Sequence, residues 1–369
     1  MKKKIIVISA VNLVEGGTLT ILRECVASLS RSRFSKEYNI VVLVHKCDLL
    51  PNYENIIYVE YPRAKKNYLY RCYYEYIGFK KLSKGLSPEL WLSLHDMSPI
   101  VKTKRQAVYM HNPSPFYKAS LWVVIHSFKY ALFSWFYKYV YKINIHANNY
   151  LIVQQQWLRD EFSKMFSFPM DKIIVAPPRV FSLKTKAIDG EVQGLKCVFF
   201  YPAFPRAFKN FEIICQASRL LNERGIANFE VILTIDGSEN GYSQRVVKEY
   251  KDVRSIHFVG LLQREKVIEY YERSNCLIFP SLLETWGLPI TEYVQYHKHM
   301  IIADLPYAHE TAAGADNVVF FNPYDEVELS QYMEQVIESN FNKFHHVPDV
   351  NLLPPAVFSW EALFSLLLT

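Results

Sequence analysis

The stretch "CLIFPSLLETWGLPITE", residues 276–292, decides the fold. It opens with an unbroken apolar run, which predicts a strand buried on both faces of a parallel sheet. A Gly-Leu-Pro sequence then marks the start of a helix, because glycine adopts unusual backbone angles and proline suits the first helical turn. Two carboxylates, Glu284 and Glu292, stand on either side of this turn. They indicate either a binding site or, more simply, a Ser281-x-x-Glu284 capping box with Glu292 as a solvated helix residue.

Strands and helices alternate along the rest of the chain. Helical periodicity is clear at residues 18–32 and 68–83, for example. A polar, weakly patterned segment at about residues 179–194 follows a Pro-Pro pair and predicts a linker. We therefore expect an α/β protein with two Rossmann-like doubly wound domains, residues 1–180 and 181–369, that face a central cleft. The last helix, "SWEALFSLLL", could pack back on the first domain. Apolar runs that predict strands include "KIIVISA", "IVVLV", "LWLSLH", "QAVYMH", "YLIVQ", "CVFFYP", "FEVILTI", "HMIIA" and "VVFF".

The composition restricts the class of partner. The chain has 369 residues and a net charge of +6, which favours anionic small molecules or a phospholipid surface and is too weak to indicate nucleic acid. Its six cysteines lack metal-binding spacing, so reduced thiols in a cytoplasmic protein are expected. The basic, apolar start "MKKKIIVISAV" is better explained as a first strand than as a signal peptide, since no cleavage site of small residues follows it.

Cations and glycines follow two of the predicted strands. In "YPAFPRAFKNFEII", Arg206 and Lys209 precede a helix start, where they oppose the helix dipole and would suit a diphosphate. The alternative is a solvated basic loop. Gly16 and Gly17 lie between the first strand and the first helix, where backbone N–H groups bind anions, although an ordinary tight turn is equally compatible. The G-x-G-x-x-G dinucleotide fingerprint is absent, which argues against a nicotinamide-linked dehydrogenase.

Polar side chains also end strands of the first half. His111 begins "HNPSPF", and His95 and Asp96 end the preceding strand. We expect a site role for His111 and a structural role for the other two. The sequence contains no DxD, HExxH or His/Cys ligand spacing, so no protein-bound metal and no cofactor are expected.

The segment at residues 120–146 is strongly apolar and aromatic, with lysines interspersed. The lysines argue against a membrane-spanning helix. Two interpretations remain: an amphipathic segment that lies on an anionic membrane surface, or a long core helix.

With these features in place, the sequence resembles the retaining glycosyltransferases of the GT-B fold, in the group 1 (family four) class. The resemblance rests on the E-x7-E element in "ETWGLPITE", on "PRAFKN" in place of the phosphate-binding cations, on the Gly-Gly turn and on "HNPSPF". It covers essentially the whole chain and is strongest in the second half. The family usually spaces its Arg and Lys further apart, so the role of Arg206 is less secure than that of Lys209.

The resemblance implies a role for each candidate residue. Glu284 would hold hydroxyls of the donor sugar, Glu292 the donor ribose, and His111 would touch the transferred sugar. Lys209, with Arg206, would neutralise the leaving diphosphate, and Gly16 and Gly17 would bring backbone N–H groups toward its phosphates. Gly287 and Leu288 would also contact the donor.

The implied reaction is the transfer of a hexose-type sugar, with retention, from a nucleotide-diphosphate sugar to a hydroxyl of a glycan acceptor. We expect that acceptor to be lipid-linked, in bacterial surface polysaccharide synthesis, with the enzyme at the cytoplasmic face of the membrane. The alternatives are a nucleotide-sugar epimerase of the same fold and a non-catalytic protein that binds glycan or membrane.

Overall fold

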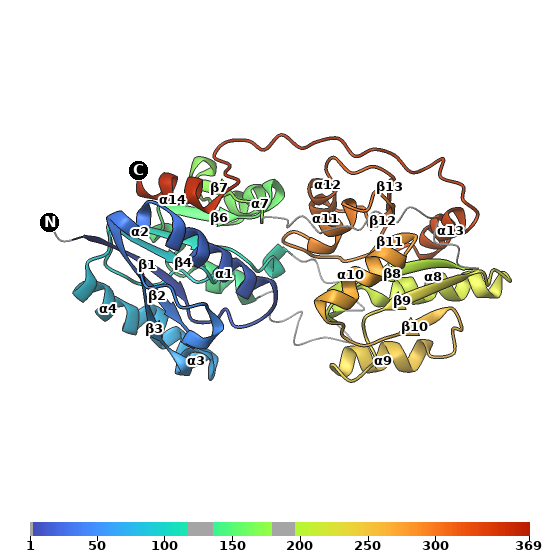
Figure 1. Cartoon of the computed structure of the whole chain (residues 1–369), viewed down its shortest axis with the longest axis horizontal. Coiled ribbons are helices and arrows are strands. Elements are labelled where there is room, and N and C mark those ends of the chain that lie inside the picture. The colour runs from blue at the N-terminus through green and yellow to red at the C-terminus, as the bar shows by residue number, and fades with distance from the viewer. Residues whose placement is uncertain (1–2, 117–135, 179–195) are drawn as a thin grey trace. The chain divides into compact units, whose positions relative to one another are not determined.

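The fold is seen in a computed structural model, which describes residues 3–116, 136–178 and 196–369 (Figure 1). The predicted linker lies outside the described residues, as does most of the aromatic segment at residues 120–146. The described chain divides into two compact units. The N-terminal unit contains residues 3–116, 136–178 and 352–369, and the C-terminal unit contains residues 196–351.

Each unit is built on a parallel sheet. The strands of the N-terminal unit are β1 (Lys4–Ala10), β2 (Tyr38–Val44), β3 (Ile56–Glu60), β4 (Leu90–Ser93), β5 (Arg105–Tyr109), β6 (Tyr150–Val153) and β7 (Ile173–Val175). Those of the C-terminal unit are β8 (Cys197–Tyr201), β9 (Phe229–Leu233), β10 (Ile256–Phe258), β11 (Cys276–Phe279), β12 (His299–Ala303) and β13 (Val318–Phe321).

Helices connect these strands. The N-terminal unit has α1 (Gly16–Arg31), α2 (Phe34–Glu37), α3 (Tyr68–Tyr73), α4 (Phe79–Leu86), α7 (Gln156–Phe166) and α14 (Trp360–Leu368). The C-terminal unit has α8 (Phe211–Glu223), α9 (Gly241–Tyr250), α10 (Arg264–Arg273), α11 (Leu288–Val294), α12 (Pro306–Thr311) and α13 (Glu326–Ile337).

The strand order of both sheets is doubly wound. It is β3-β2-β1-β4-β5-β6-β7 in the N-terminal unit and β10-β9-β8-β11-β12-β13 in the C-terminal unit, as far as the chain is described. Each unit starts at an inner strand, β1 or β8, runs to one edge and then crosses to the other side. The prediction of an α/β protein with Rossmann-like sheets is therefore confirmed. The order reverses between β1 and β4 and between β8 and β11, and such a reversal opens a crevice at the carboxyl ends of the two strands.

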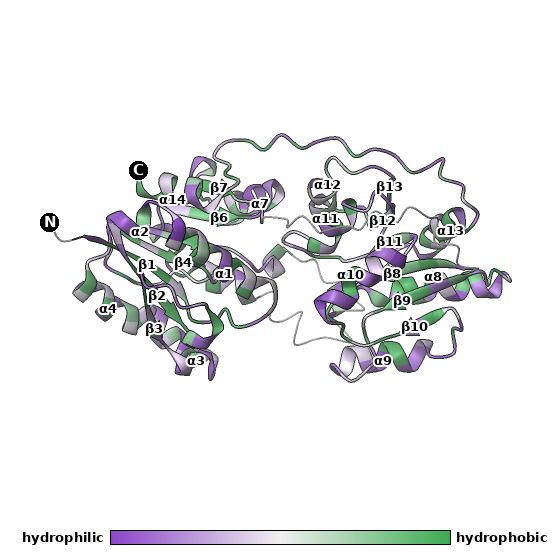
Figure 2. Cartoon of the chain, viewed as in Figure 1, coloured by the Kyte–Doolittle hydropathy of each residue, from purple (hydrophilic) through white to green (hydrophobic). Residues whose placement is uncertain are grey.

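Alternate side chains of strand β1 enter two different cores of the N-terminal unit, one on each face of the sheet. Ile6 and Ile8 of β1 pack on the face that α1 and α14 cover, whereas Val7 and Trp91 pack with Phe79 of α4 on the other face. Because both faces are covered, the strands are apolar at nearly every position, as Figure 2 shows.

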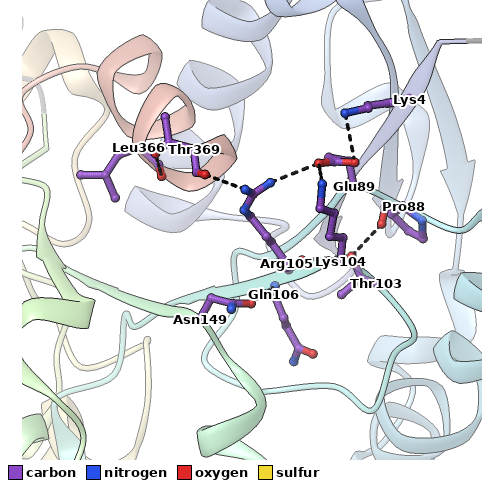
Figure 3. A network of polar contacts seen from close by, with 10 residues as sticks. All are labelled: Lys4, Pro88, Glu89, Thr103, Lys104, Arg105, Gln106, Asn149, Leu366 and Thr369. Atoms are coloured by element: carbon purple, nitrogen blue, oxygen red, sulfur yellow. Dashed lines mark hydrogen bonds and ion pairs between the residues drawn. The ribbon is translucent and has the colours of Figure 1, made fainter.

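The last helix, α14, belongs to the N-terminal unit. Its Leu363, Phe364 and Leu367 are buried in the same core as α1. Arg105 Nη2 donates to the Thr369 carbonyl oxygen at 2.6 Å, and Arg105 Nη1 lies 3.1 Å from Glu89 Oε1 (Figure 3). The chain therefore returns from the C-terminal unit to complete the first core.

Candidate functional site

The strand reversal in the C-terminal unit brings two predicted site residues together. Lys209 follows β8 and Glu284 follows β11, and these strands are neighbours in the sheet. Lys209 Nζ donates to Glu284 Oε1 in a close ion pair. The side chains are 18% and 13% exposed, so little of the pair faces bulk water. The sequence separation of 75 residues concealed this contact.

Backbone contacts hold the two loops in register. Leu282 N donates to the Phe208 carbonyl oxygen at 2.7 Å, and Tyr201 OH donates to that of Lys209 at 2.8 Å. Tyr307 OH donates to the Ser281 carbonyl oxygen at 2.7 Å from α12. The ammonium group therefore sits on a braced loop, which is the arrangement that electrostatic stabilisation of a bound charge requires.

Arg206 lies at the beginning of the same loop and is exposed, with its guanidinium 5.3 Å from the centre of the Phe204 ring. Asn210 ends the loop in the left-handed conformation, with φ +56°, and its amide donates to the Pro323 carbonyl oxygen at 2.8 Å. The structure thus gives Arg206 freedom to reach an anion, whereas Lys209 is fixed.

The helix after Glu284 begins at Gly287, not at Ser281. Gly287 is the N-cap residue of α11 and has φ +93°, and Leu288 is the first helical residue. Ser281 Oγ lies 3.2 Å from the Leu283 carbonyl oxygen and 3.4 Å from that of Phe208, to which it donates. The capping-box interpretation is therefore wrong, because Ser281 lies six residues before the N-cap and its hydroxyl donates to loop carbonyl oxygens instead of accepting from a helix N–H group.

Gly287→Ala is expected to lower the free energy of unfolding by about 1–3 kcal/mol, because a residue with a Cβ is strained at this φ. The added Cβ would also lie 3.4 Å from Ile290 Cδ1. Gly241→Ala is the matched control, since its Cβ would meet nothing within 4 Å. Urea unfolding of both variants checks this, and equal stabilities would contradict it.

Glu292 is held by two residues that the sequence analysis did not single out. Arg264 Nη1 donates to Glu292 Oε1 at 2.7 Å, and Tyr271 OH donates to Oε2 at 2.9 Å. Glu292 is 9% exposed, which excludes its interpretation as a solvated helix residue. Arg264 is the first residue of α10. The signal that identified Lys209, a cation at a helix start after a strand, was therefore present in the sequence at Arg264 too.

In the N-terminal unit, Gly16 and Gly17 form an open helix start. Gly16 has φ +61°, and a Cβ at either residue would meet nothing within 4 Å. Glu15 is the N-cap residue of α1, but its side chain makes no hydrogen bond to the backbone N–H groups of the first turn. The N–H groups of the first turn are thus accessible to an anion.

His111 is fixed from two sides. Its Nε2 donates to the Leu94 carbonyl oxygen at 2.8 Å, and its backbone N–H donates to Asp96 Oδ1 at 2.5 Å. Burial lowers the pKa of His111, against the opposing effect of Asp96. The neutral ring therefore carries its proton on Nε2 and keeps Nδ1 as an acceptor. Asp96, expected to be merely structural, orients this histidine and accepts from Tyr141 OH at 2.9 Å.

Beneath this group lies a buried polar cluster of Arg71, Glu75 and His95. Arg71 Nη2 donates to the His95 carbonyl oxygen at 2.7 Å, and Glu75 Oε1 lies 3.4 Å from His95 Nε2. Burial raises the pKa of Glu75 to about 8, although the Arg71 charge opposes this, and burial lowers the pKa of His95 well below its usual range. The Glu75 carboxyl therefore keeps its proton to a higher pH than an exposed glutamate does.

The raised pKa of Glu75 predicts that stability falls as pH rises from about 4.5 to about 8. The unfolded chain releases this proton at its usual pKa, whereas the folded chain keeps it up to the raised value. Glu75→Gln should remove that loss, because a glutamine has no proton to release. The free energy of unfolding of the variant minus that of the wild type should therefore be larger at pH 8 than at pH 5, by a few kcal/mol to order of magnitude. Urea unfolding of both proteins at the two pH values tests this; a gain that is constant or shrinks with pH would contradict it.

The residues that the structure describes contain neither a metal-binding cluster nor a membrane-spanning helix. No group of three or more His, Cys, Asp or Glu side chains within them is arranged to hold a metal ion. Within the same residues, no helix has the length and hydrophobicity needed to cross a membrane.

Comparison with known proteins agrees with this geometry. Residues 183–348 match the family described as glycosyl transferases group 1. The chain is 18% identical over 296 residues to the O-antigen chain mannosyltransferase RfbU of Salmonella typhimurium, a match that covers 79% of this chain and 78% of the relative.

Solved structures share the fold at low sequence identity. The apo form of the lipopolysaccharide outer core galactosyltransferase WaaB superposes with a TM-score of 0.64 at 15% identity, covering 92% of this chain and 91% of the other. Anabaena HepE, solved in complex with UDP-glucose, gives a TM-score of 0.58 at 12% identity, covering 92% and 91%. The C-terminal unit is therefore a group 1 glycosyltransferase domain, in a chain that has the GT-B fold.

Proposed function

We propose that this protein is a retaining glycosyltransferase that moves a hexose-type sugar from a nucleotide-diphosphate sugar to a hydroxyl of a glycan acceptor. The observation that carries the proposal is the Lys209–Glu284 pair at the strand reversal of the C-terminal unit. There a cation and a carboxylate stand side by side, one suited to phosphate oxygens and the other to sugar hydroxyls.

The remaining groups of the C-terminal unit extend this site. Glu292, with Arg264 and Tyr271 as its partners, presents a fixed carboxylate for the ribose diol. Arg206, which is exposed, is the second cation for the diphosphate, and the backbone at Gly287 and Leu288 begins helix α11. In the N-terminal unit, Gly16 and Gly17 offer further N–H groups to phosphate oxygens, and His111 Nδ1 would accept from a hydroxyl of the transferred sugar.

In the proposed step, the bond from the anomeric carbon to the diphosphate oxygen breaks and the electron pair goes to the nucleoside diphosphate. Positive charge develops on the sugar, and Lys209 and Arg206 stabilise the negative charge of the leaving group. The acceptor hydroxyl attacks from the leaving-group face, and its proton passes to a phosphate oxygen. We propose that these cations make a divalent ion unnecessary, so the rate should be the same with EDTA as with Mg²⁺.

We further propose that the acceptor is lipid-linked and that the enzyme builds a bacterial surface polysaccharide at the cytoplasmic face of the membrane. Two similar proteins support this by their names: RfbU is an O-antigen chain mannosyltransferase and WaaB a lipopolysaccharide outer core galactosyltransferase. The net charge of +6 suits both an anionic donor and an anionic membrane surface.

The test is thermal unfolding of the purified chain with UDP-, GDP- and dTDP-sugars and the free nucleotides, followed by turnover with the donor that stabilises it. Binding of one nucleotide family, and release of its diphosphate only when a glycan acceptor is added, is the expected result. Conversion of the donor sugar without acceptor would indicate an epimerase. A folded protein that no nucleotide stabilises would indicate a non-catalytic binding protein.

A further inference from the structure

An unusual surface helix lies in the N-terminal unit. Helix α3, a π-helical turn at Tyr74–Gly78 and α4 form one continuous rod over residues 68–86 (Figure 1). Its buried side chains recur every four residues, at Arg71, Glu75, Phe79 and Ser83. A regular α-helix repeats every 3.6 residues, so the wider π-helical turn keeps this buried row facing the sheet.

The opposite side of the rod exposes large apolar side chains at the same spacing. Leu69 is 80% exposed, Tyr73 is 52% exposed and Ile77 is 59% exposed. Tyr68 and Tyr70 flank them and are 45% and 38% exposed. A contiguous row of exposed large apolar residues is uncommon on a soluble monomer and indicates an interaction surface.

Basic side chains surround this row. Arg63 and Lys66 precede the rod, and Lys80, Lys81 and Lys84 continue it; all five are exposed. None of the five makes an ion pair with any residue that the structure describes. The only acidic residue between positions 61 and 86 is Glu75, which is fully buried. The exposed charged side chains within that range are thus all basic, and Lys65 among them pairs with the exposed Glu15 carboxylate, 3.6 Å away.

We propose that this surface, called here the basic-aromatic face, docks the protein on an anionic phospholipid bilayer. It consists of Arg63, Lys66, Leu69, Tyr73, Ile77, Lys80, Lys81 and Lys84, with Tyr68 and Tyr70 at its border. The apolar tips would enter the boundary between headgroups and acyl chains, the tyrosine hydroxyls would remain among the headgroups, and the cations would meet lipid phosphates. An acidic protein groove fits less well, because it would leave Leu69, at 80% exposure, facing charge.

The docking proposal rests on the proposed function and extends it, because a transferase with a lipid-linked acceptor must work at the membrane surface. The membrane interpretation of residues 120–146 stays a separate prediction, since most of that segment lies outside the described residues. Docking itself requires no catalysis, so it is measured separately from sugar transfer.

The test is co-flotation of the full-length chain with vesicles of 30% phosphatidylglycerol and 70% phosphatidylethanolamine, and with neutral phosphatidylcholine vesicles. The wild type is expected to float with the anionic vesicles only. K80Q/K81Q/K84Q should weaken this binding about a hundredfold, since each basic residue near an anionic surface contributes about 1 kcal/mol. L69Q/I77Q should weaken it about tenfold.

The matched control is K164Q/K248Q/K251Q, which removes the same charge from exposed lysines elsewhere. It should bind like the wild type, and thermal unfolding should show all variants folded. Equal losses in both lysine triples, no loss in L69Q/I77Q, or a wild type that ignores anionic vesicles would each overturn the proposal. Donor-induced stabilisation of K80Q/K81Q/K84Q should be unchanged, which separates failure of docking from failure of the donor site.

Discussion

Lys209→Met should lower kcat for sugar transfer by about 10²–10³-fold, the effect of removing one preorganised charge donor from a transition state. The ammonium group is held by Glu284 on a loop that Tyr201 and Leu282 brace, so it needs no reorganisation as charge develops on the diphosphate. No other described lysine pairs with a carboxylate at this strand reversal.

The same substitution leaves the Glu284 carboxylate, 13% exposed, without its charge partner, so some loss of stability is expected as well. Lys209→Met combined with Glu284→Gln removes the unpaired charge and should regain stability without regaining turnover. Lys266→Met, at an exposed ion pair on α10, is the control and should retain both. Steady-state rates at saturating donor and acceptor give kcat, and a folded Lys209→Met enzyme with wild-type kcat would exclude the proposed role.

The sequence was sufficient to predict the strands and the loops that follow them. Continuous apolar runs such as "CLIFPS" have one stable environment, a covered parallel sheet, and their carboxyl ends face the crevice by the geometry of the fold. The positions of Lys209, Glu284 and Gly287 at strand ends followed from this alone. Which loops become neighbours depends on strand order, and only the structure showed that β8 lies beside β11.

Partners of the site residues were harder to predict, because they are set by packing across the sheet. Tyr271 reaches Glu292 from α10, and nothing in its sequence surroundings, "IEYYERS", marks it as the partner of a site residue. Glu75 was included in a predicted amphipathic helix over residues 68–83, where a carboxyl would normally face water. The four-residue repeat of the buried row, which needs the π-helical turn, places it inside.

Glu292→Gln should raise the KM for the donor about 10–100-fold and change kcat much less, because a ribose contact is made equally in the ground state and the transition state. The carboxylate oxygens offer about four acceptor positions, and Arg264 and Tyr271 occupy two of them. The others remain for the two ribose hydroxyls. An amide would turn one acceptor into a donor and, if it faced Arg264, would set two donors against each other.

Two neighbouring variants separate this role from a structural one. Tyr271→Phe keeps the carboxylate and removes one hydrogen bond to it, so the KM for the donor should rise by less than for Glu292→Gln. Arg264→Gln frees Glu292 Oε1 while leaving its charge, so donor binding should persist, with the donor-induced rise in Tm as the readout. If Glu292→Gln instead lowers kcat at an unchanged KM, the carboxylate acts on the reacting sugar and not on the ribose. That result would exchange the roles assigned to Glu284 and Glu292, since each carboxylate is fixed by its own cation, Lys209 or Arg264.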